Sequence, residues 1–198
     1  MLSLFEETEL FDAGKKRYTA FDIPDAELRL WEQFIDKASA SLYYEVLLHH
    51  TPWKQRERKM YDKMVPDPRL TAWYGPNGLP FTPPLPEIQT MVEAQCNIHF
   101  DSVLLNLYRD GKDSVAWHSD TLPADGKHHP IASVSFGETR PFQVRHKRRK
   151  DVSQIEIPLT HGSFLLMGAS MQAHYEHHIP KTAKTIAPRI NLTFRITQ

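Results

Sequence analysis

The chain has 198 residues, 40% of them hydrophobic and 11% aromatic, which is enough for one folded domain with a sizeable core. Its 24 basic residues balance its 24 acidic residues, so net charge gives no argument for a nucleic-acid partner, and such an argument must rest on local clusters. The single cysteine, Cys96, excludes an intramolecular disulfide and fits a reducing compartment, and we expect it to be a small buried side chain.

No segment reaches the roughly 18 apolar residues that a membrane-spanning helix needs. The N-terminal segment 1–8 is short and acidic and lacks the basic start of a secretory signal. We therefore expect a soluble, cytoplasmic protein with no membrane partner, and we expect it to be a monomer.

A helix is predicted near the start of the chain. Pro24 followed by Asp25 and Glu27 is typical of a helix start, because proline suits the first turn and acidic groups interact favourably with the helix dipole there. Apolar residues recur at helical spacing after this point. The pattern therefore predicts a helix over residues 24–40.

The rest of the first half gives a mixed pattern. Residues 43–48 form an apolar run that is ambiguous between helix and strand, with a strand as one interpretation. Residues 52–86 are rich in proline, glycine and charge, which predicts loops and short strands. Residues 84–98 again carry apolar groups at helical spacing, so a second helix is predicted there.

From residue 103 onward the pattern changes to short alternating runs, each ended by a turn signal. These runs are residues 103–109, 132–136, 142–146, 155–159, 163–167, 173–179 and 189–197. Many short strands at close spacing are typical of a sandwich, barrel or jelly roll. The sequence therefore predicts N-terminal helices followed by a mainly β core.

Two histidines and one aspartate are candidates for a metal site. His118 and Asp120 come just after a predicted strand, and side chains two residues apart point to the same face of an extended chain. A later strand offers a second imidazole from His174, His177 or His178. Two histidines and one carboxylate leave three metal positions open, as in non-haem iron(II) oxygenases. A solvated turn and surface imidazoles are the alternatives.

The last strand has a strictly alternating pattern. One face is apolar and belongs to a core, whereas the other carries Arg189, Asn191, Thr193 and Arg195. Guanidinium groups match carboxylates in a bidentate way, so this polar face is either exposed or part of a dicarboxylate site. The two arginines lie about 20 Å apart along an extended strand, so both can reach a five-carbon acid only if the strand is curved.

An earlier strand repeats this theme. Asn106 and Tyr108 share one face of the run 103–109, opposite to its leucines. An amide and a phenol on that face could complete the hydrogen bonding of the same acid.

Six short motifs in order resemble the AlkB family of iron(II)- and 2-oxoglutarate-dependent dioxygenases. They are Asn-Leu-Tyr at 106–108, His-Ser-Asp at 118–120, Ala-Ser-Val-Ser-Phe-Gly at 132–137, His-Gly-Ser at 161–163, His-His-Ile-Pro at 177–180 and Pro-Arg-Ile-Asn-Leu-Thr-Phe-Arg at 188–195. The stretch Pro-Arg-Leu-Thr-Ala-Trp-Tyr-Gly at 68–75 resembles the nucleic-acid repair branch in particular. The resemblance runs from about residue 50 to 196.

The resemblance implies a double-stranded β-helix, which is a cupin-type jelly roll, in one domain over residues 1–198. Residues 1–100 would form an N-terminal helical and nucleotide-recognition part, and residues 101–198 would form the catalytic core. The implied iron(II) ligands are His118, Asp120 and His177, and His177 is chosen because it precedes a residue-aliphatic-proline step. The implied 2-oxoglutarate ligands are Asn106, Tyr108, Arg189, Asn191, Thr193 and Arg195, with Arg189 on the distal carboxylate and Arg195 near the metal-bound end.

The resemblance also implies a reaction. With O2, the family demethylates 1-methyladenine and 3-methylcytosine in DNA, and RNA is a further candidate substrate; formaldehyde, succinate and CO2 are released. Candidates for the base pocket are Trp73, Tyr74, Phe81 and Thr121, and core packing is the alternative for the aromatic residues. Thr121 and Leu122 stand where repair members usually carry a carboxylate.

Two basic runs, residues 54–59 and 145–150, could contact phosphates or could be solvated loops. Two other functions compete with nucleic-acid demethylation. One is a 2-oxoglutarate oxygenase that acts on a protein or a small molecule. The other is a non-catalytic metal-binding cupin, against which the paired arginines of the last strand argue.

Overall fold

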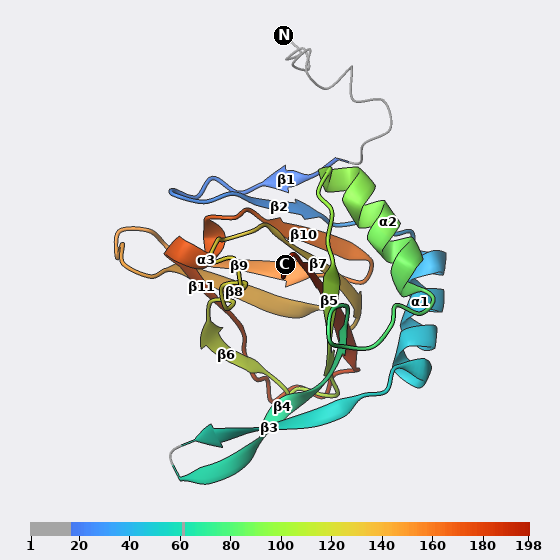
Figure 1. The fold of residues 1–198 in the computed structure, drawn as a ribbon. Helices are drawn as coiled ribbons and strands as arrows, with labels where there is room; N and C mark the ends of the chain where they lie inside the picture. Colours follow the sequence, from blue (N-terminus) through green and yellow to red (C-terminus); the bar gives the residue numbers. More distant parts are fainter. Residues whose placement is uncertain (1–16, 61) are drawn as a thin grey trace.

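The structure, a computed structural model, describes residues 17–60 and 62–198, so the expectation for the N-terminal segment 1–8 lies outside the described residues. Its largest element is an eight-stranded antiparallel sheet (Figure 1). In spatial order the strands are β1 (Thr19–Ala20), β2 (Leu28–Trp31), β10 (Ser163–Met167), β7 (Ile131–Gly137), β12 (Arg189–Arg195), β5 (Ser102–Tyr108), β4 (Lys63–Tyr74) and β3 (Lys54–Met60).

A smaller antiparallel sheet packs against the large one. In spatial order its strands are β6 (Val115–His118), β11 (Tyr175–Ile179), β8 (Arg140–His146) and β9 (Ile155–Leu159). Apolar side chains from both sheets form one buried cluster between them, with Leu165 and Met167 from the large sheet and Val144 and Ile157 from the small one. Two packed antiparallel sheets confirm the predicted mainly β architecture.

Two helices cover the outer face of the large sheet, on the side away from the small sheet (Figure 1). They are α1 (Lys37–His50) and α2 (Leu85–Cys96), and α2 confirms the helix predicted over residues 84–98. The short helix α3 (Met171–His174) directly precedes β11. None of these described helices combines the length and the apolar character that crossing a bilayer requires.

The helix predicted over residues 24–40 is wrong in its first half. Residues 28–31 form β2, which pairs with β10 so that Leu30 lies opposite Leu165. The helix begins only at Lys37, after Asp36, whose carboxylate accepts the backbone N–H groups of residues 38 and 39. Pairing with β10 therefore outweighs the helical spacing of the apolar residues, and the run 43–48 lies inside α1 rather than in a strand.

The loops and short strands predicted over residues 52–86 are largely one long hairpin. β3 and β4 pair along most of their length and project from the sheet (Figure 1). β4 continues through Pro66 and Pro68, beside a register shift in β3 between Gln55 and Glu57. A proline lacks the N–H that a ladder needs, and a bulge is a place where a strand tolerates this.

The two basic runs lie on different hairpins. Residues 54–59 belong to β3, where the side chains of Lys54 and Arg56 are exposed. Residues 145–150 lie at the end of β8 and in the turn that leads to β9. In this second run Arg145 pairs with Glu176 at 2.8 Å and Arg149 pairs with Asp151 at 2.7 Å.

A histidine in the turn before β10 joins helix α1 to the large sheet. The backbone N–H of Gly137, at the end of β7, donates to Nδ1 of His161 over 2.9 Å, and Nε2 of His161 lies 3.3 Å from Oγ of Ser41. Nδ1 must be unprotonated to accept this bond. Burial lowers the pKa of His161 below its ordinary value, so the fold stabilises the neutral form.

We expect the free energy of unfolding to fall as the pH drops below 6.5, the ordinary pKa of histidine, and to keep falling until the pH passes the lower folded-state pKa. The reason is that the unfolded chain binds this proton more readily than the folded chain does. Urea unfolding at about pH 7.5 and about pH 5.5 measures the loss. His161→Asn keeps an acceptor but does not titrate, so it should lose less stability over this range. Equal losses in both proteins would contradict the assignment.

Candidate functional site

A cavity of about 220 Å³ lies between the two sheets. Most of the residues singled out in the sequence line it. They are Asn106, Tyr108, His118, Asp120, Thr121, His177, Arg189, Asn191, Thr193 and Arg195. The structure thus brings the predicted metal ligands and the predicted 2-oxoglutarate ligands to one place.

Strand pairing brings the two histidines together. β6 pairs with β11 so that His118 lies opposite His177, and the two ring centres are 4.4 Å apart. One ligand atom from each of His118, Asp120 and His177 lies within 4.8 Å of the others. Nδ1 of His118 lies 2.8 Å from the carbonyl oxygen of Ala116 and donates to it, which leaves Nε2 with its lone pair on the side of Asp120.

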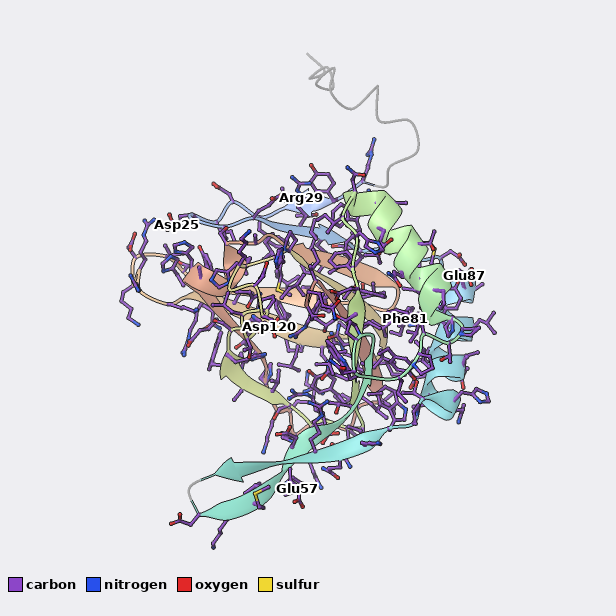
Figure 2. All side chains as sticks on the ribbon, in the orientation of Figure 1. Asp25, Arg29, Glu57, Phe81, Glu87 and Asp120 are labelled. Atoms are coloured by element: carbon purple, nitrogen blue, oxygen red, sulfur yellow. The ribbon has the colours of Figure 1, made fainter. Side chains whose placement is uncertain are left out.

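Asp120 is held from two directions. Its backbone N–H donates to Oε1 of Gln172 over 2.7 Å, and its Oδ1 accepts from Nη2 of Arg195 over 2.7 Å. Burial raises the pKa of Asp120, but Arg195, His177 and His118 lower this pKa by more, so the net shift is below the ordinary value. The carboxylate is therefore ionised inside the protein, between the two sheets (Figure 2).

His177 is buried and neutral. Burial lowers its pKa to about 4, and the ring packs 5.1 Å from that of Phe142. A neutral imidazole is the form that binds a metal. Two imidazoles and one ionised carboxylate make a donor set that fits iron(II) and leaves other coordination positions open.

Arg189 is a buried cation that lacks most of its partners. It is 1% exposed, and its Nη2 donates to Oγ of Ser135 over 2.9 Å. Its Nε and Nη1 are buried and have no hydrogen-bond partner among the described residues. Burial lowers the pKa of Arg189 to about 10, which still leaves it charged at neutral pH. Unsatisfied donors on a cation that lines a cavity fit a carboxylate of a bound ligand.

The other polar side chains of β12 form a hydrogen-bonded row. Nδ2 of Asn191 donates to Oγ of Ser133 over 2.7 Å, and Oγ1 of Thr193 donates to Oδ1 of Asn191 over 3.0 Å. In the pairing with β5, Arg189 lies opposite Tyr108 and Asn191 lies opposite Asn106. Both faces of β12 are as predicted, because its apolar residues are fully buried on the opposite side.

The two arginines of β12 line the same cavity from its two ends. Arg195 contacts Asp120, whereas Arg189 lies beside Tyr108, with its guanidinium carbon 5.3 Å from the ring centre. Only Arg189 keeps several free donors, and the second guanidinium is already paired. The two arginines therefore need not bind the same small acid: Arg189 is free to bind a carboxylate of a ligand, whereas Arg195 binds Asp120.

The structure adds residues that the sequence analysis missed. Arg69 lines the cavity and its Nε donates to Oδ1 of Asn106 over 2.8 Å, and Ser133, Ser135 and Gln172 also contact the site residues. Ser133 and Ser135 lie two residues apart in the recognised stretch 132–137, so the sequence alone could have placed them on one face of a strand. Gln172 lies in a short helix, where spacing gives no such signal.

The four candidates for base recognition separate into two pairs. Trp73 and Thr121 line a second cavity of about 200 Å³, which shares Thr121 and Arg195 with the first. Tyr74 is in the hydrophobic core, and Phe81 packs edge-on against it at 6.4 Å. Neither Tyr74 nor Phe81 lines either cavity, and Figure 2 shows Phe81 near the helices, away from Asp120.

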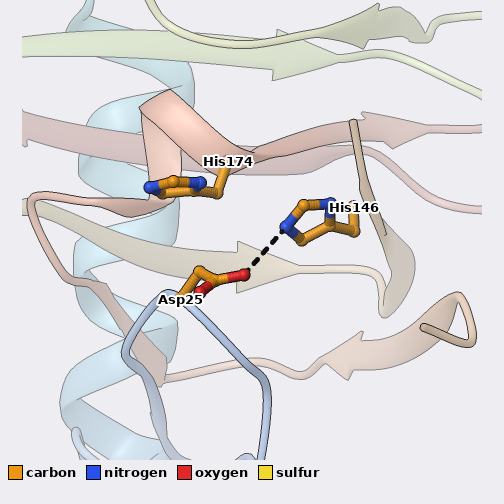
Figure 3. Close-up of side chains that lie close together, drawn as sticks. All are labelled: Asp25, His146 and His174. Atoms are coloured by element: carbon orange, nitrogen blue, oxygen red, sulfur yellow. Dashed lines mark ion pairs between the residues drawn. The ribbon is translucent and has the colours of Figure 1, made fainter. Parts of the chain in front are cut away.

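A second cluster also contains one aspartate and two histidines, but its hydrogen bonds do not favour metal binding. Asp25, His146 and His174 lie close together, and Nε2 of His146 is 3.3 Å from Oδ2 of Asp25 (Figure 3). Nδ1 of His146 accepts the backbone N–H groups of Arg148 and Arg149. The proton of the neutral ring is therefore on Nε2, which leaves no lone pair there for a metal. We assign this cluster to a close contact between the Nε2–H group of His146 and the carboxylate of Asp25.

The chain matches the model of the 2OG-Fe(II) oxygenase superfamily over residues 27–195. A solved structure described as "The structure of OsALKBH1" superimposes with a TM-score of 0.63 and covers 90% of this chain and 100% of that one. Its sequence identity is 14%, so this likeness bears on the fold alone.

Curated relatives are more similar in sequence. Alpha-ketoglutarate-dependent dioxygenase alkB homolog 3 of Mus musculus is 40% identical over 186 residues, which cover 84% of this chain and 64% of the relative. The Homo sapiens protein of that name gives the same values. DNA oxidative demethylase ALKBH2 of Homo sapiens is 36% identical over 155 residues, covering 69% of this chain and 59% of the relative. The chain thus spans less than two thirds of the length of these relatives.

Replacing Arg189 tests whether it is kept for a ligand rather than for stability. Arg189→Met should raise the free energy of unfolding of the metal-free, ligand-free protein by on the order of 1 kcal/mol, because a buried cation with few partners is removed. Arg140 is the matched control. It is 2% exposed, and it donates to the backbone carbonyls of residues 110, 113 and 180.

Arg140→Met should therefore lower the free energy of unfolding, since three backbone carbonyls lose a donor. Urea unfolding of both variants measures the contrast. An Arg189→Met protein as destabilised as Arg140→Met would show that Arg189 stabilises the fold.

Proposed function

The chain belongs to the AlkB family within the 2OG-Fe(II) oxygenase superfamily, and we propose that it is a dioxygenase that oxidatively demethylates alkylated nucleobases. DNA is the proposed substrate, with 1-methyladenine and 3-methylcytosine as the first lesions to test, and RNA is a further one. The observation that carries the proposal is a single cavity with a three-donor metal set at one end and an unsatisfied buried guanidinium at the other.

The proposed iron(II) ligands are His118, Asp120 and His177. Their support is the clustering of the three donor atoms, together with the lone pair of His118 that its bond to Ala116 leaves free. Arg195 keeps the carboxylate ionised, and Gln172 holds the backbone of Asp120. Such supporting contacts orient metal ligands and tune their basicity.

The proposed 2-oxoglutarate site is the other end of the cavity. Arg189 would receive the distal carboxylate, because it has unsatisfied donors and no carboxylate partner among the described residues. Tyr108 lies beside it, and Asn106, Asn191 and Thr193 line the wall toward the metal end. Arg195 would keep Asp120 in place near the metal-bound end of the acid.

When bound, iron(II), 2-oxoglutarate and O2 supply an oxidant that converts an N-methyl group to a hydroxymethyl group, which is lost as formaldehyde, with succinate and CO2 as co-products. The chain contributes positioning and the exclusion of water, since His177 and Arg189 are buried and the other donors line the same cavity between the two sheets. A base in a duplex cannot reach these groups, so it must leave the stack at a cost of a few kcal/mol.

The names of the relatives support the substrate class. One group is named for a 2-oxoglutarate-dependent dioxygenase activity and another for the oxidative demethylation of DNA. The exposed Lys54 and Arg56 on the β3–β4 hairpin could meet phosphates, whereas Arg145 and Arg149 of the second basic run are already paired with acids. The first run is therefore the better candidate for a phosphate contact.

The proposal predicts a coupled reaction. Incubation with iron(II), 2-oxoglutarate, ascorbate and a set of methylated oligonucleotides should give succinate and an oligonucleotide that has lost the mass of one methylene. Mass spectrometry follows the base and a succinate assay follows the co-substrate. Succinate without the loss of a methyl group from any base would instead favour an oxygenase of proteins or small molecules. No succinate under any condition would favour a non-catalytic metal-binding protein.

Asp120→Ala should abolish turnover, because it removes one metal donor and leaves Arg195 unpaired in the cavity. Iron binding, measured by equilibrium dialysis, should weaken by at least about tenfold, the range seen for weakened metal shells. Asp25→Ala is the control. It removes a carboxylate from the second His–Asp–His cluster and should leave iron binding and turnover unchanged. Retained activity in Asp120→Ala, or lost iron binding in Asp25→Ala, would refute the ligand assignment.

A further inference from the structure

The second cavity opens from the metal end of the first. The two cavities share Thr121, the residue after Asp120, and Arg195, which pairs with Asp120. A group seated in the second cavity therefore lies next to the proposed iron ligands and away from Arg189. With a volume of about 200 Å³, this cavity is separate from the proposed 2-oxoglutarate end.

The lining of the second cavity suits a planar heteroaromatic ring. Trp73 supplies an aromatic side chain whose Nε1 is already bonded to the carbonyl of Pro76, so its contribution to a ligand is its ring surface. Leu122, Pro123 and Ile131 are apolar, and Gln172 supplies an amide that faces the same region. A stacking surface with a few polar groups at the edge is the arrangement that holds an extruded base.

No free carboxylate faces either cavity among the described residues. Asp120 is the acidic residue that lines the first cavity, and its Oδ1 is paired with Arg195. The lining of the second cavity contains no acidic residue and carries His128, His129 and Arg195. The basic side chains Arg69, Arg189 and Arg195 line the first.

Two carboxylates of the neighbouring segments are already engaged in hydrogen bonds. Asp125 lies 2.8 Å from Nε2 of His129 and accepts the backbone N–H of Lys127. Asp101 accepts the backbone N–H groups of Thr197 and Gln198 and the hydroxyl of Thr197. Neither of these aspartates is part of a cavity wall.

We infer that the second cavity receives the target base and that it selects uncharged N-methylated bases over cationic ones. The inference rests on the proposed function and adds its substrate preference. Ring methylation makes 3-methylcytosine and 1-methyladenine cations at neutral pH, whereas 3-methyluracil and 1-methylinosine remain neutral. A cation in this cavity meets no free carboxylate among the described residues, so no opposite charge offsets the loss of its hydration, whereas a neutral base does not carry this cost.

The preference is measured with matched lesions. The first pair is 3-methylcytosine and 3-methyluracil, and the second is 1-methyladenine and 1-methylinosine, each placed in the same single-stranded oligonucleotide. Within each pair the ring and the methyl group stay alike, and the charge and one exocyclic group change. Binding to the iron(II)- and 2-oxoglutarate-loaded protein without O2, followed by fluorescence anisotropy, reports affinity without turnover. The kcat/KM for methyl removal is measured separately.

We expect the neutral member of each pair to bind more tightly and to be demethylated with the higher kcat/KM, by about tenfold. Adding the missing charge should remove this preference. Thr121→Asp should raise the ratio of cationic to neutral lesion by about tenfold, the effect of one charge-assisted hydrogen bond. Thr121→Asn is the control of similar size without the charge, and it should leave the ratio near that of the wild type.

Three further variants, at two positions, test the place of the base. Leu122→Asp puts the carboxylate one residue farther from Asp120 and should shift the same ratio in the same direction, while Leu122→Asn should not. Trp73→Leu should weaken the binding of both members of each pair to a similar extent, because stacking does not depend on this charge difference.

The outcomes distinguish a failure of the inferred base preference from a failure of the proposed demethylase function. Methyl removal in which the wild type prefers the cationic lesions, or in which Thr121→Asp and Thr121→Asn give the same ratio, overturns the inference and leaves the demethylase function standing. Undiminished binding in Trp73→Leu overturns the location of the base. Succinate formation without the removal of any methyl group overturns the proposed function itself.

Discussion

The ion pair between Arg195 and Asp120 connects the last strand of the large sheet to the segment after β6 in the small sheet. Burial raises the pKa of Asp120, so its carboxylate depends on the positive charge of Arg195 to remain ionised between the sheets. A buried ion pair adds little net stability, because both partners lose their hydration. Its contribution here is positional, since it holds the carboxylate beside the two histidines that the β6–β11 register brings together.

The two buried arginines show how differently the fold treats the same side chain. Arg140 and Arg189 are both almost fully buried, yet Arg140 donates to three backbone carbonyls and Arg189 donates to one serine hydroxyl. Arg140 thereby ties together the loop after β5 and the end of β11. Arg189 has unsatisfied hydrogen-bond donors that an anionic ligand can pair with. Such a residue trades stability for binding, because its donors are kept ready for the ligand.

Much of the site could be predicted because its residues lie on strands with a strict period of two. The alternation of Arg189, Asn191, Thr193 and Arg195 predicted one polar face, and pairing with β5 and β7 placed that face in the interior. A sequence pattern defines a face but not what covers it. The sequence alone therefore leaves solvent exposure of this polar face as an alternative, and the small sheet that covers the face excludes it.

The misplaced elements have the same physical origin. Leu28, Leu30 and Trp31 fit a helical spacing over so short a run, and only the non-local pairing with β10 makes them a strand. Prolines in β4 suggested loops, whereas the bulged hairpin accommodates them. Tyr74 belongs to the recognised stretch 68–75, but the side of a strand on which an aromatic ring packs depends on neighbours that local sequence does not specify. Phe81 lies outside the strands and packs against Tyr74.

The two cavities differ in how their residues are held in place. The proposed iron and 2-oxoglutarate ligands lie on or next to paired strands, where a shift of one residue would turn every side chain to the wrong face. Much of the second cavity comes from the loop 121–130, which carries Thr121, Leu122, Pro123, His128, His129 and Pro130. A loop tolerates substitutions that paired strands do not, because the register of strand pairing does not depend on the loop.

The residues proposed for catalysis therefore lie on or next to paired strands, whereas those proposed to select the base lie largely in the loop 121–130. Thr121 and Leu122 can differ in charge from the residues of related proteins without moving His118, His177 or Arg189, whose positions follow from strand pairing. Asp120 lies at the boundary, two residues after the end of β6 and at the start of the loop, and two separate contacts hold it there. A change of base preference through this loop therefore requires no change in the oxidising end of the cavity.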